Sequence, residues 1–275
     1  MDYSAFTKKL HDCFNSFLPE YIGTTHHRAS TKIKADNTPA GDLDNDTLES
    51  IRALVLDHFP GDYTIGEEDK KDGKEMQEIL GRSDQYQWSI DGLDGTGNLR
   101  LKTSSFGTMI ARRKGNDILY AAIFRPTDEM VRGDGFFYAE HGKGVWQWCS
   151  EHWMYEQLNQ PESPSGRLVV MLEGSSKKFF RPPISEMGQK VTVRPGFSSS
   201  VAITTVVLQD NDGEKSALVM AENKPWDMWP ALLFIREFGG IVTDWQGNPA
   251  MPDNCGSIIA TVNQTDHDYL LQFFK

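Results

Sequence analysis

The sequence is poor in cysteine and has no excess of positive charge. It contains three cysteines, Cys13, Cys149 and Cys255, far apart and without a Cys-x-x-Cys spacing. Neither a disulfide framework nor a zinc knuckle is therefore predicted, and a reducing compartment fits best. Lysine and arginine number 28 against 39 acidic residues, a net charge of -11. We expect no nucleic-acid partner and no membrane partner, because both favour basic surfaces.

Long apolar runs are also absent. Residues 1–20 carry charges throughout, and no stretch elsewhere approaches the roughly 18 apolar residues that a membrane-spanning helix needs. We therefore expect a soluble, cytoplasmic protein. With 275 residues, 39% of them hydrophobic, the chain is long enough for one large or two moderate domains with real cores, and disorder is not expected.

The first 60 residues show helical spacing of apolar side chains. The pattern i, i+4, i+7, i+8 over residues 6–18 predicts a first amphipathic helix, and a similar pattern predicts a second over residues 47–59. Pro60 and Gly61 end the second helix. His26 and His27, between these helices, are expected in a polar loop, and we assign them no metal.

Short extended runs dominate the rest of the chain. Runs at 63–65, 86–90, 106–111, 118–124 and 135–148 predict a mostly antiparallel sheet behind the two helices. The polar segment 156–166 follows, and then runs at 168–172, 191–193, 217–221, 241–244 and 257–262 alternate with helical patterns. We predict an N-terminal α+β domain in residues 1–155 and a C-terminal α/β domain in residues 156–275.

One segment joins a strand to a glycine-rich, acidic turn. Polar and apolar residues alternate over 86–91, so a strand that turns Ile90 to the core turns Asp91 to its other side. The chain continues Gly92-Leu93-Asp94-Gly95-Thr96-Gly97-Asn98. The glycines permit a tight turn with exposed N–H groups, a suitable cradle for an anion. Asp91 and Asp94 repel each other unless a cation lies between them. An ordinary Asp/Gly turn explains the same residues, whereas the ligand spacing of an EF-hand is not met.

Further polar segments each have an ordinary explanation. Glu67 and Glu68 follow a predicted strand, as solvated loop residues often do. Asp227 stands at the predicted start of a helix that ends at Gly239-Gly240, where the helix macrodipole favours a carboxylate. Serines 198–200 precede another helical pattern and are typical N-cap residues.

In combination and in this order, however, the segments form a specific pattern. It reads Gly66-Glu67-Glu68, then Trp88-x-Ile90-Asp91-x-Leu93-Asp94-Gly95-Thr96-x-Asn98, then Trp226-Asp227 before a helix ending Gly239-Gly240-x-Val242-Thr243-Asp244. This resembles the inositol monophosphatase family and its bisphosphate nucleotidase and histidinol phosphatase relatives. Residues 34–39 with Asp44 resemble another stretch of that family, so the resemblance spans residues 34–244. It implies an α+β / α/β fold, a layered αβαβα sandwich of the inositol monophosphatase and fructose-1,6-bisphosphatase type.

The resemblance implies two magnesium sites. Glu67, Asp91 and the carbonyl of Leu93 would hold one ion, and Asp91, Asp94 and Asp227 would hold the second. Each of these ligands is an oxygen, which selects a hard cation such as Mg²⁺ over zinc or copper. Two such ions can stabilise the attacking and leaving oxygens of an in-line displacement at phosphorus.

The resemblance also implies roles around the metals. Glu67 with Thr96 would orient the attacking water, and Asp44 would hydrogen-bond Thr96. The amides of Gly95 and Thr96 would contact the phosphate. The other expected substrate contacts are Ser199, Glu222 and Lys224. The alcohol side of the pocket departs from the relatives, which place a glutamate where this chain has Met220.

We therefore predict Mg²⁺-dependent hydrolysis of a small phosphate monoester, an inositol, sugar or amino-alcohol phosphate, by metal-activated water. One alternative is a 3'(2'),5'-bisphosphate nucleotidase, in which Arg181 or Arg194 could bind the second phosphate. Another is a non-catalytic interaction protein on the same fold. Lithium sensitivity and a homodimer follow from the resemblance.

Overall fold

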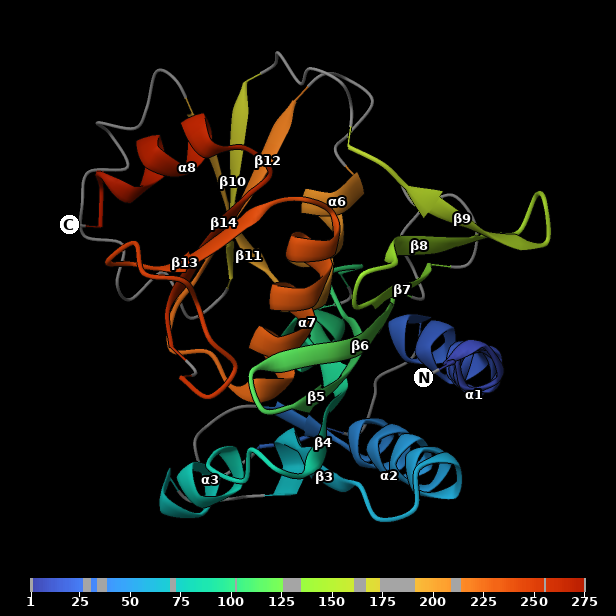
Figure 1. Ribbon diagram of the computed structural model, residues 1–275. Helices are drawn as coiled ribbons and strands as arrows, with labels where there is room; N and C mark the ends of the chain where they lie inside the picture. Colours follow the sequence, from blue (N-terminus) through green and yellow to red (C-terminus); the bar gives the residue numbers. More distant parts are fainter. Residues whose placement is uncertain are drawn as a thin grey trace.

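The computed structural model describes residues 2–26, 31–33, 39–69, 73–101, 103–125, 135–160, 167–173, 191–208, 214–254 and 256–274. The described helices and sheets alternate in layers (Figure 1). Helices α6 and α7 lie between two large sheets, and further helices cover the outer faces. The predicted αβαβα sandwich is confirmed.

The first large sheet has seven strands in sequential order from β3 to β9. β3 (Tyr63–Gly66) runs parallel to β4 (Tyr86–Asp94), and each later pair is antiparallel. The later strands are β5 (Gly107–Lys114), β6 (Asp117–Phe124), β7 (Phe136–Glu140), β8 (Gly144–Cys149) and β9 (Met154–Leu158). The expected mostly antiparallel sheet is therefore confirmed.

Two details of this sheet differ from the prediction. The run 135–148 is two strands, because the chain turns through Gly142, whose φ of 72° suits glycine. β9 was not predicted, and it overlaps the start of the proposed domain boundary at 156–166, of which residues 161–166 lie outside the described part.

Helices α1 (Ser4–His26) and α2 (Asp42–His58) cover one face of this sheet. Their apolar stripes bury Phe6, Leu10, Ile51 and Val55 against strand residues that include Trp88. Two boundaries were wrong. α1 continues to His26, which therefore lies in a helix, whereas His27 is outside the described residues. α2 begins at Asp42 rather than at residue 47.

Shorter elements border this layer. They are the two-stranded sheet of β1 (Thr31–Ile33) and β2 (Pro39–Gly41), the 3-10 helix η1 (Glu67–Asp69), α3 (Gly73–Leu80) and α4 (Thr96–Arg100). Residues 34–38 of the resembling stretch lie outside the described residues. No helix within the described ranges has both the length and the apolarity to span a bilayer.

The second large sheet has the order β11-β10-β12-β14-β13. Its strands are β10 (Leu168–Glu173), β11 (Val191–Phe197), β12 (Lys215–Met220), β13 (Ile241–Asp244) and β14 (Ile258–Thr261). β10 is parallel to β11 and β12, and β14 is antiparallel to β12 and β13. α8 (Gln264–Leu271) packs on its outer face.

The middle layer consists of α6 (Ser199–Leu208) and α7 (Pro225–Glu237). Both helices are buried around most of their circumference, as expected for helices enclosed by two sheets. Together they form the largest core cluster with residues of both sheets, including Met109 and Leu218. Residues from the two halves of the chain therefore meet in one core.

Candidate active site

A bulge in β4 brings two carboxylates to the same side of the seven-stranded sheet. Asp91 pairs with Met109, and Asp94 pairs with Gly107, so three steps along β4 match two steps along β5. Residues three apart on a regular strand face opposite sides, but one extra residue reverses that parity. Asp91 and Asp94 therefore share the face of Met109, which α6 and α7 cover. Ile90 faces the opposite core, as predicted, although the strand continues beyond Asp91.

The third carboxylate comes from the middle layer. Lys224 is the N-cap of α7, Pro225 follows it, and Asp227 lies in the first turn, as the sequence predicts. Carboxylate oxygens of Asp91, Asp94 and Asp227 lie within 4.8 Å of one another. We call these three residues the carboxylate cluster. Asp91 and Asp94 are buried, and Asp227 is half-buried.

The start of α6 holds two members of the cluster. The backbone N–H groups of Ser199 and Ser200 donate to the two oxygens of Asp94, at 3.2 and 2.6 Å. The Ser199 hydroxyl donates to Asp227 at 2.9 Å. Ser199 was expected to contact the substrate, whereas in the structure its N–H and hydroxyl support the carboxylates of the cluster. The role of Ser200 was not predicted.

Thr96 stands at the entrance to α4 beside the same cluster. Its hydroxyl lies 2.9 Å from the carbonyl oxygen of Leu93 and 3.5 Å from Oδ2 of Asp44. The predicted proximity of Asp44 and Thr96 is thus present, although 3.5 Å is long for a hydrogen bond. Gly95 before it has φ 84°, and a Cβ there would lie 2.7 Å from the Ser105 carbonyl oxygen. Only glycine fits this turn without strain.

Negative charge is concentrated around Asp91. Burial raises the pKa of Asp91 well above its ordinary value, and the neighbouring carboxylates of Glu67, Asp94, Asp44 and Asp227 raise it further. Glu67 belongs to η1 and is half-buried; it lies outside the cluster as defined by mutual distance, yet it comes first among these neighbours. An all-oxygen set of crowded carboxylates is suited to hold a metal cation.

The remaining expected substrate contacts, Glu222 and Lys224, come shortly before Asp227 in the chain. Glu222 and Lys224 are exposed, on the segment between β12 and α7, and Glu222 adopts a φ of 54°. Met220 is fully buried in the core between the sheets. Arg194 is exposed and lies 3.6 Å from Glu214, and Arg181 is outside the described residues.

Comparison with protein families gives a match to nearly the whole chain. The model described as the inositol monophosphatase family matches residues 10–274. Among curated proteins, the chain is 25% identical over 241 residues to a fructose-1,6-bisphosphatase/inositol-1-monophosphatase of Aquifex aeolicus, covering 85% of this chain and 80% of that protein. It is 29% identical over 189 residues to an inositol-1-monophosphatase of Rhizobium meliloti, covering 68% and 67%.

Among solved structures, the fold is similar to that of an IMPase of Thermotoga maritima. The TM-score is 0.74 at 19% identity, and the alignment covers 100% of this chain and 97% of that chain. This likeness concerns the layered architecture, in agreement with the sandwich described above.

Proposed function

The chain belongs to the inositol monophosphatase family, and on that premise we propose that it hydrolyses a small phosphate monoester with the help of Mg²⁺. The chain is a phosphoric monoester hydrolase. We propose Mg²⁺ as its metal, a role for each site residue and a small monoester as its substrate. The observation that carries it is the carboxylate cluster, in which Asp91, Asp94 and Asp227 converge from two distant parts of the sequence.

The donor set fits magnesium. Asp91, Asp94 and Asp227 would hold one ion, and Glu67, Asp91 and the Leu93 carbonyl would hold another, each through oxygen. When bound, magnesium supplies positive charge for the phosphoryl oxygens and acidity for a water molecule. The raised pKa of Asp91 agrees with the assignment, because burial and four neighbouring carboxylates disfavour its ionised form and a bound cation would favour it.

The chain's own residues then orient the reactants. The Thr96 hydroxyl donates its proton to Leu93 or Asp44, which leaves its oxygen free to accept a hydrogen bond from water. Glu67 would accept the second hydrogen of that water. The amides of Gly95 and Thr96, at the tight turn after Asp94, would contact the phosphate. Ser199 would keep Asp227 turned toward the phosphate side.

A substrate with one phosphate suits this surface better than a bisphosphate. Glu67 lies near enough to raise the pKa of Asp91, Glu68 follows it in η1, and Glu222 comes shortly before Asp227, in a chain of net charge -11. Each unscreened carboxylate facing a second phosphate costs on the order of 1 kcal/mol at high effective dielectric. Arg194, one cation considered for a second phosphate, already has an acidic neighbour in Glu214.

The test is a substrate panel with saturating Mg²⁺. Inositol, sugar and amino-alcohol monophosphates are compared with a 3',5'-bisphosphorylated adenosine by kcat/KM, and Asp91→Asn serves as the inactive control. We expect the highest kcat/KM for one of the monoesters. A preference for the bisphosphate would favour the nucleotidase alternative, and no turnover of any substrate would favour the interaction protein.

We also propose that the protein forms a homodimer and is located in the cytoplasm. The monomer mass is 31.0 kDa, so light scattering of the purified chain at twice that value would support the dimer. A monomeric mass at all concentrations would oppose it.

A further inference from the structure

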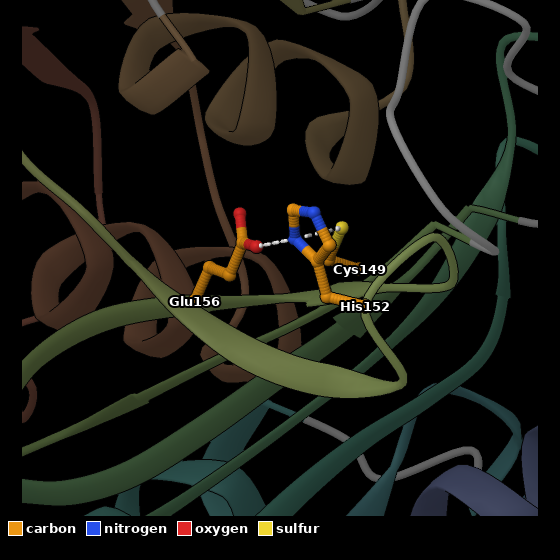
Figure 2. Close-up of side chains that lie close together, drawn as sticks. All are labelled: Cys149, His152 and Glu156. Carbon is orange, nitrogen blue, oxygen red and sulfur yellow. Dashed lines mark hydrogen bonds and ion pairs between the residues drawn. The ribbon is translucent and has the colours of Figure 1, made fainter.

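A second group of potential ligands lies on the β8–β9 hairpin, away from the carboxylate cluster. Cys149 ends β8, His152 lies in the turn, and Glu156 lies in β9 (Figure 2). β9 is the edge strand, five strands from β4 in the sheet order, which corresponds to a distance on the order of 20 Å. The hairpin group is therefore independent of the proposed phosphatase site.

The hairpin geometry brings the three donor atoms together. Cys149 pairs with Met154, and Gln147 pairs with Glu156, so Cys149 and Glu156 are diagonal neighbours on one face. The turn then folds His152 over them. Sγ of Cys149 lies 3.5 Å from Nδ1 of His152, and Oε1 of Glu156 is hydrogen-bonded to the same nitrogen. Sulfur, nitrogen and oxygen are all within 4.8 Å of one another.

This arrangement differs from a nucleophilic relay. In a cysteine–histidine–acid relay the thiol and the carboxylate contact opposite ring nitrogens. Here both groups contact Nδ1, as Figure 2 shows, so the histidine cannot pass a proton from one to the other across its ring. Three donor atoms this close together can instead bind one metal ion, as one face of its coordination polyhedron.

The sulfur–nitrogen distance and the donor types suit a tetrahedral metal. Bonds of about 2.3 Å to sulfur and about 2.0 Å to nitrogen at a tetrahedral angle separate these two atoms by roughly 3.5 Å. The observed separation of Sγ and Nδ1 is 3.5 Å. A thiolate and an imidazole favour zinc-like ions over the hard cations preferred by carboxylates alone.

We propose that Cys149, His152 and Glu156 bind a divalent transition-metal ion of the zinc type. The buried thiol anchors the ion, and exposed His152 and Glu156 leave the fourth position open to water. On binding, the thiol and Nδ1 release their protons to solvent, and the ion replaces the hydrogen bond between His152 and Glu156. The ion ties the edge strand β9 to β8 through side chains.

Cobalt is the appropriate probe, because thiolate coordination to Co²⁺ gives a near-ultraviolet charge-transfer band. Metal-free protein in excess Mg²⁺, which occupies the carboxylate site, is titrated with Co²⁺ and then with Zn²⁺. We expect the band to saturate at one equivalent of Co²⁺ and to disappear as Zn²⁺ displaces it. Absence of the band in the wild type would overturn the proposal.

Variants assign the band to its ligands. Cys149→Ser should abolish it, and His152→Gln or Glu156→Gln should each weaken Co²⁺ binding by more than the 10- to 100-fold typical of groups that only support a ligand. His152 and Glu156 are exposed, so these two variants keep the fold testable. Cys13→Ser and the exposed His141→Gln are matched controls that should bind as the wild type does. A band that persists in Cys149→Ser, or equal affinity in His152→Gln and Glu156→Gln, would refute the assignment.

Discussion

Asp91 is buried on the inner face of the seven-stranded sheet, with other carboxylates on several sides. Its Oδ1 accepts a hydrogen bond of 3.0 Å from the N–H of Leu93, which supports the turn. Its raised pKa means that the protonated form fits the metal-free fold better than the ionised form does. That contribution to stability is present below the unfolded-state pKa of about 3.9 and is lost as pH rises through the folded-state pKa.

Asp91→Asn should therefore stabilise the metal-free protein and at the same time weaken its binding of Mg²⁺. Asparagine keeps an acceptor for the Leu93 N–H but removes the charge, so at neutral pH the metal-free variant should melt at a higher temperature than the metal-free wild type. We expect Mg²⁺ to raise the Tm of the wild type but not that of the variant. The exposed Asp117→Asn is the control, with both properties unchanged. An undiminished response to Mg²⁺ in Asp91→Asn would contradict its role as a shared ligand.

Thr96→Ala should slow hydrolysis without loosening the metal. Its hydroxyl contacts the Leu93 carbonyl oxygen and Asp44, and Thr96 is not one of the proposed metal ligands. Loss of a group that positions water should lower kcat on the order of 100-fold, while the Mg²⁺ concentration for half-maximal activity stays near that of the wild type. Thr103→Ala is the matched control, because it removes an exposed hydroxyl that donates a hydrogen bond to the Asn98 carbonyl oxygen. Parallel losses in rate and metal affinity would instead identify Thr96 as a ligand.

At the scale of single residues, the sequence motifs predicted which carboxylates gather at the candidate site, but not the bulge and the hydrogen bonds that hold them there. Asp91, Asp94 and Asp227 were expected together and lie together. The bulge in β4 has no signature in a local alternation pattern, and it decides which side Asp94 faces. The hydrogen bonds from Ser199 and Ser200 to Asp94 join residues more than 100 positions apart, which no periodicity reports.

At the scale of elements, Gly92 controls how closely α2 approaches β4. A Cβ at Gly92 would lie 2.3 Å from the backbone oxygen of Asp44 and 3.0 Å from the N of Leu48. Gly92→Ala should force the two backbones apart, destabilise the fold by about 1–3 kcal/mol and lower activity by moving Asp44 from Thr96. A Cβ at Gly97, in the nearby α4, would meet nothing within 4 Å, so Gly97→Ala should be tolerated. Urea denaturation gives the unfolding free energy of both variants. Equal values would show that α2 can move away from β4 without a loss of stability.

His267 makes the attachment of α8 sensitive to acid. The Thr243 hydroxyl donates to the Asp244 carbonyl, so its oxygen accepts from Nε2 of His267. Among the residues that the structure describes, buried Nδ1 has no hydrogen-bond partner. Burial lowers the pKa of His267, although Asp268 opposes this. The folded state thus binds fewer protons, and stability is complete above the unfolded-state pKa of about 6.5 and falls below it.

His267→Gln should flatten this dependence, because glutamine can donate to Thr243 without taking up a proton. We expect the wild type to lose more unfolding free energy than the variant between pH 7 and pH 5, as measured by urea denaturation. The exposed His141→Gln should retain the wild-type slope. Identical slopes for wild type and His267→Gln would mean that other groups control the acid sensitivity.

Element boundaries could be predicted where burial imposes a period. β9 contains only half-buried and exposed residues and is held in the sheet by its pairing with β8, so no buried side chain marks it in the sequence. The charged α3 was missed because it has only eight residues, which is shorter than the window over which helical periodicity is recognised. The apolar stripes of α1 and α2 were visible, but their polar ends extend beyond those stripes.

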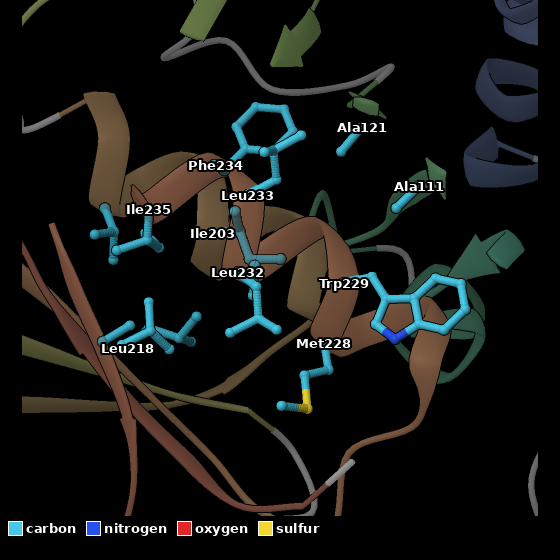
Figure 3. Close-up of a cluster of buried hydrophobic side chains, with 14 of the residues drawn as sticks. Ala111, Ala121, Ile203, Leu218, Met228, Trp229, Leu232, Leu233, Phe234 and Ile235 are labelled. Carbon is cyan, nitrogen blue, oxygen red and sulfur yellow. The ribbon is translucent and has the colours of Figure 1, made fainter. Parts of the chain in front are cut away.

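At the scale of the whole molecule, α7 joins the two sheets into one cooperative core. In Figure 3, Leu232 projects from α7 among residues that include Leu218 of the second sheet, and Ala111 and Ala121 belong to the first sheet in the same cluster. A cavity there should weaken both halves together. Leu232→Ala should cost about 2–5 kcal/mol, and the unfolding curves from circular dichroism and tryptophan fluorescence should shift together. Exposed Leu101→Ala is the control. Two separate transitions would assign the halves to independently stable domains.

The central place of α7 has a consequence for synthesis of the chain on the ribosome. The central strands of the inner face, β5 with Met109 and β6 with Ile123, have been made by residue 124, but α7, which covers them, begins about 100 residues further along the chain. At roughly 5–20 residues per second, that face waits on the order of 5–20 seconds for its partner. The nascent chain therefore presents an uncovered apolar surface, and a translational pause before residue 225 would lengthen the time for which that surface can aggregate.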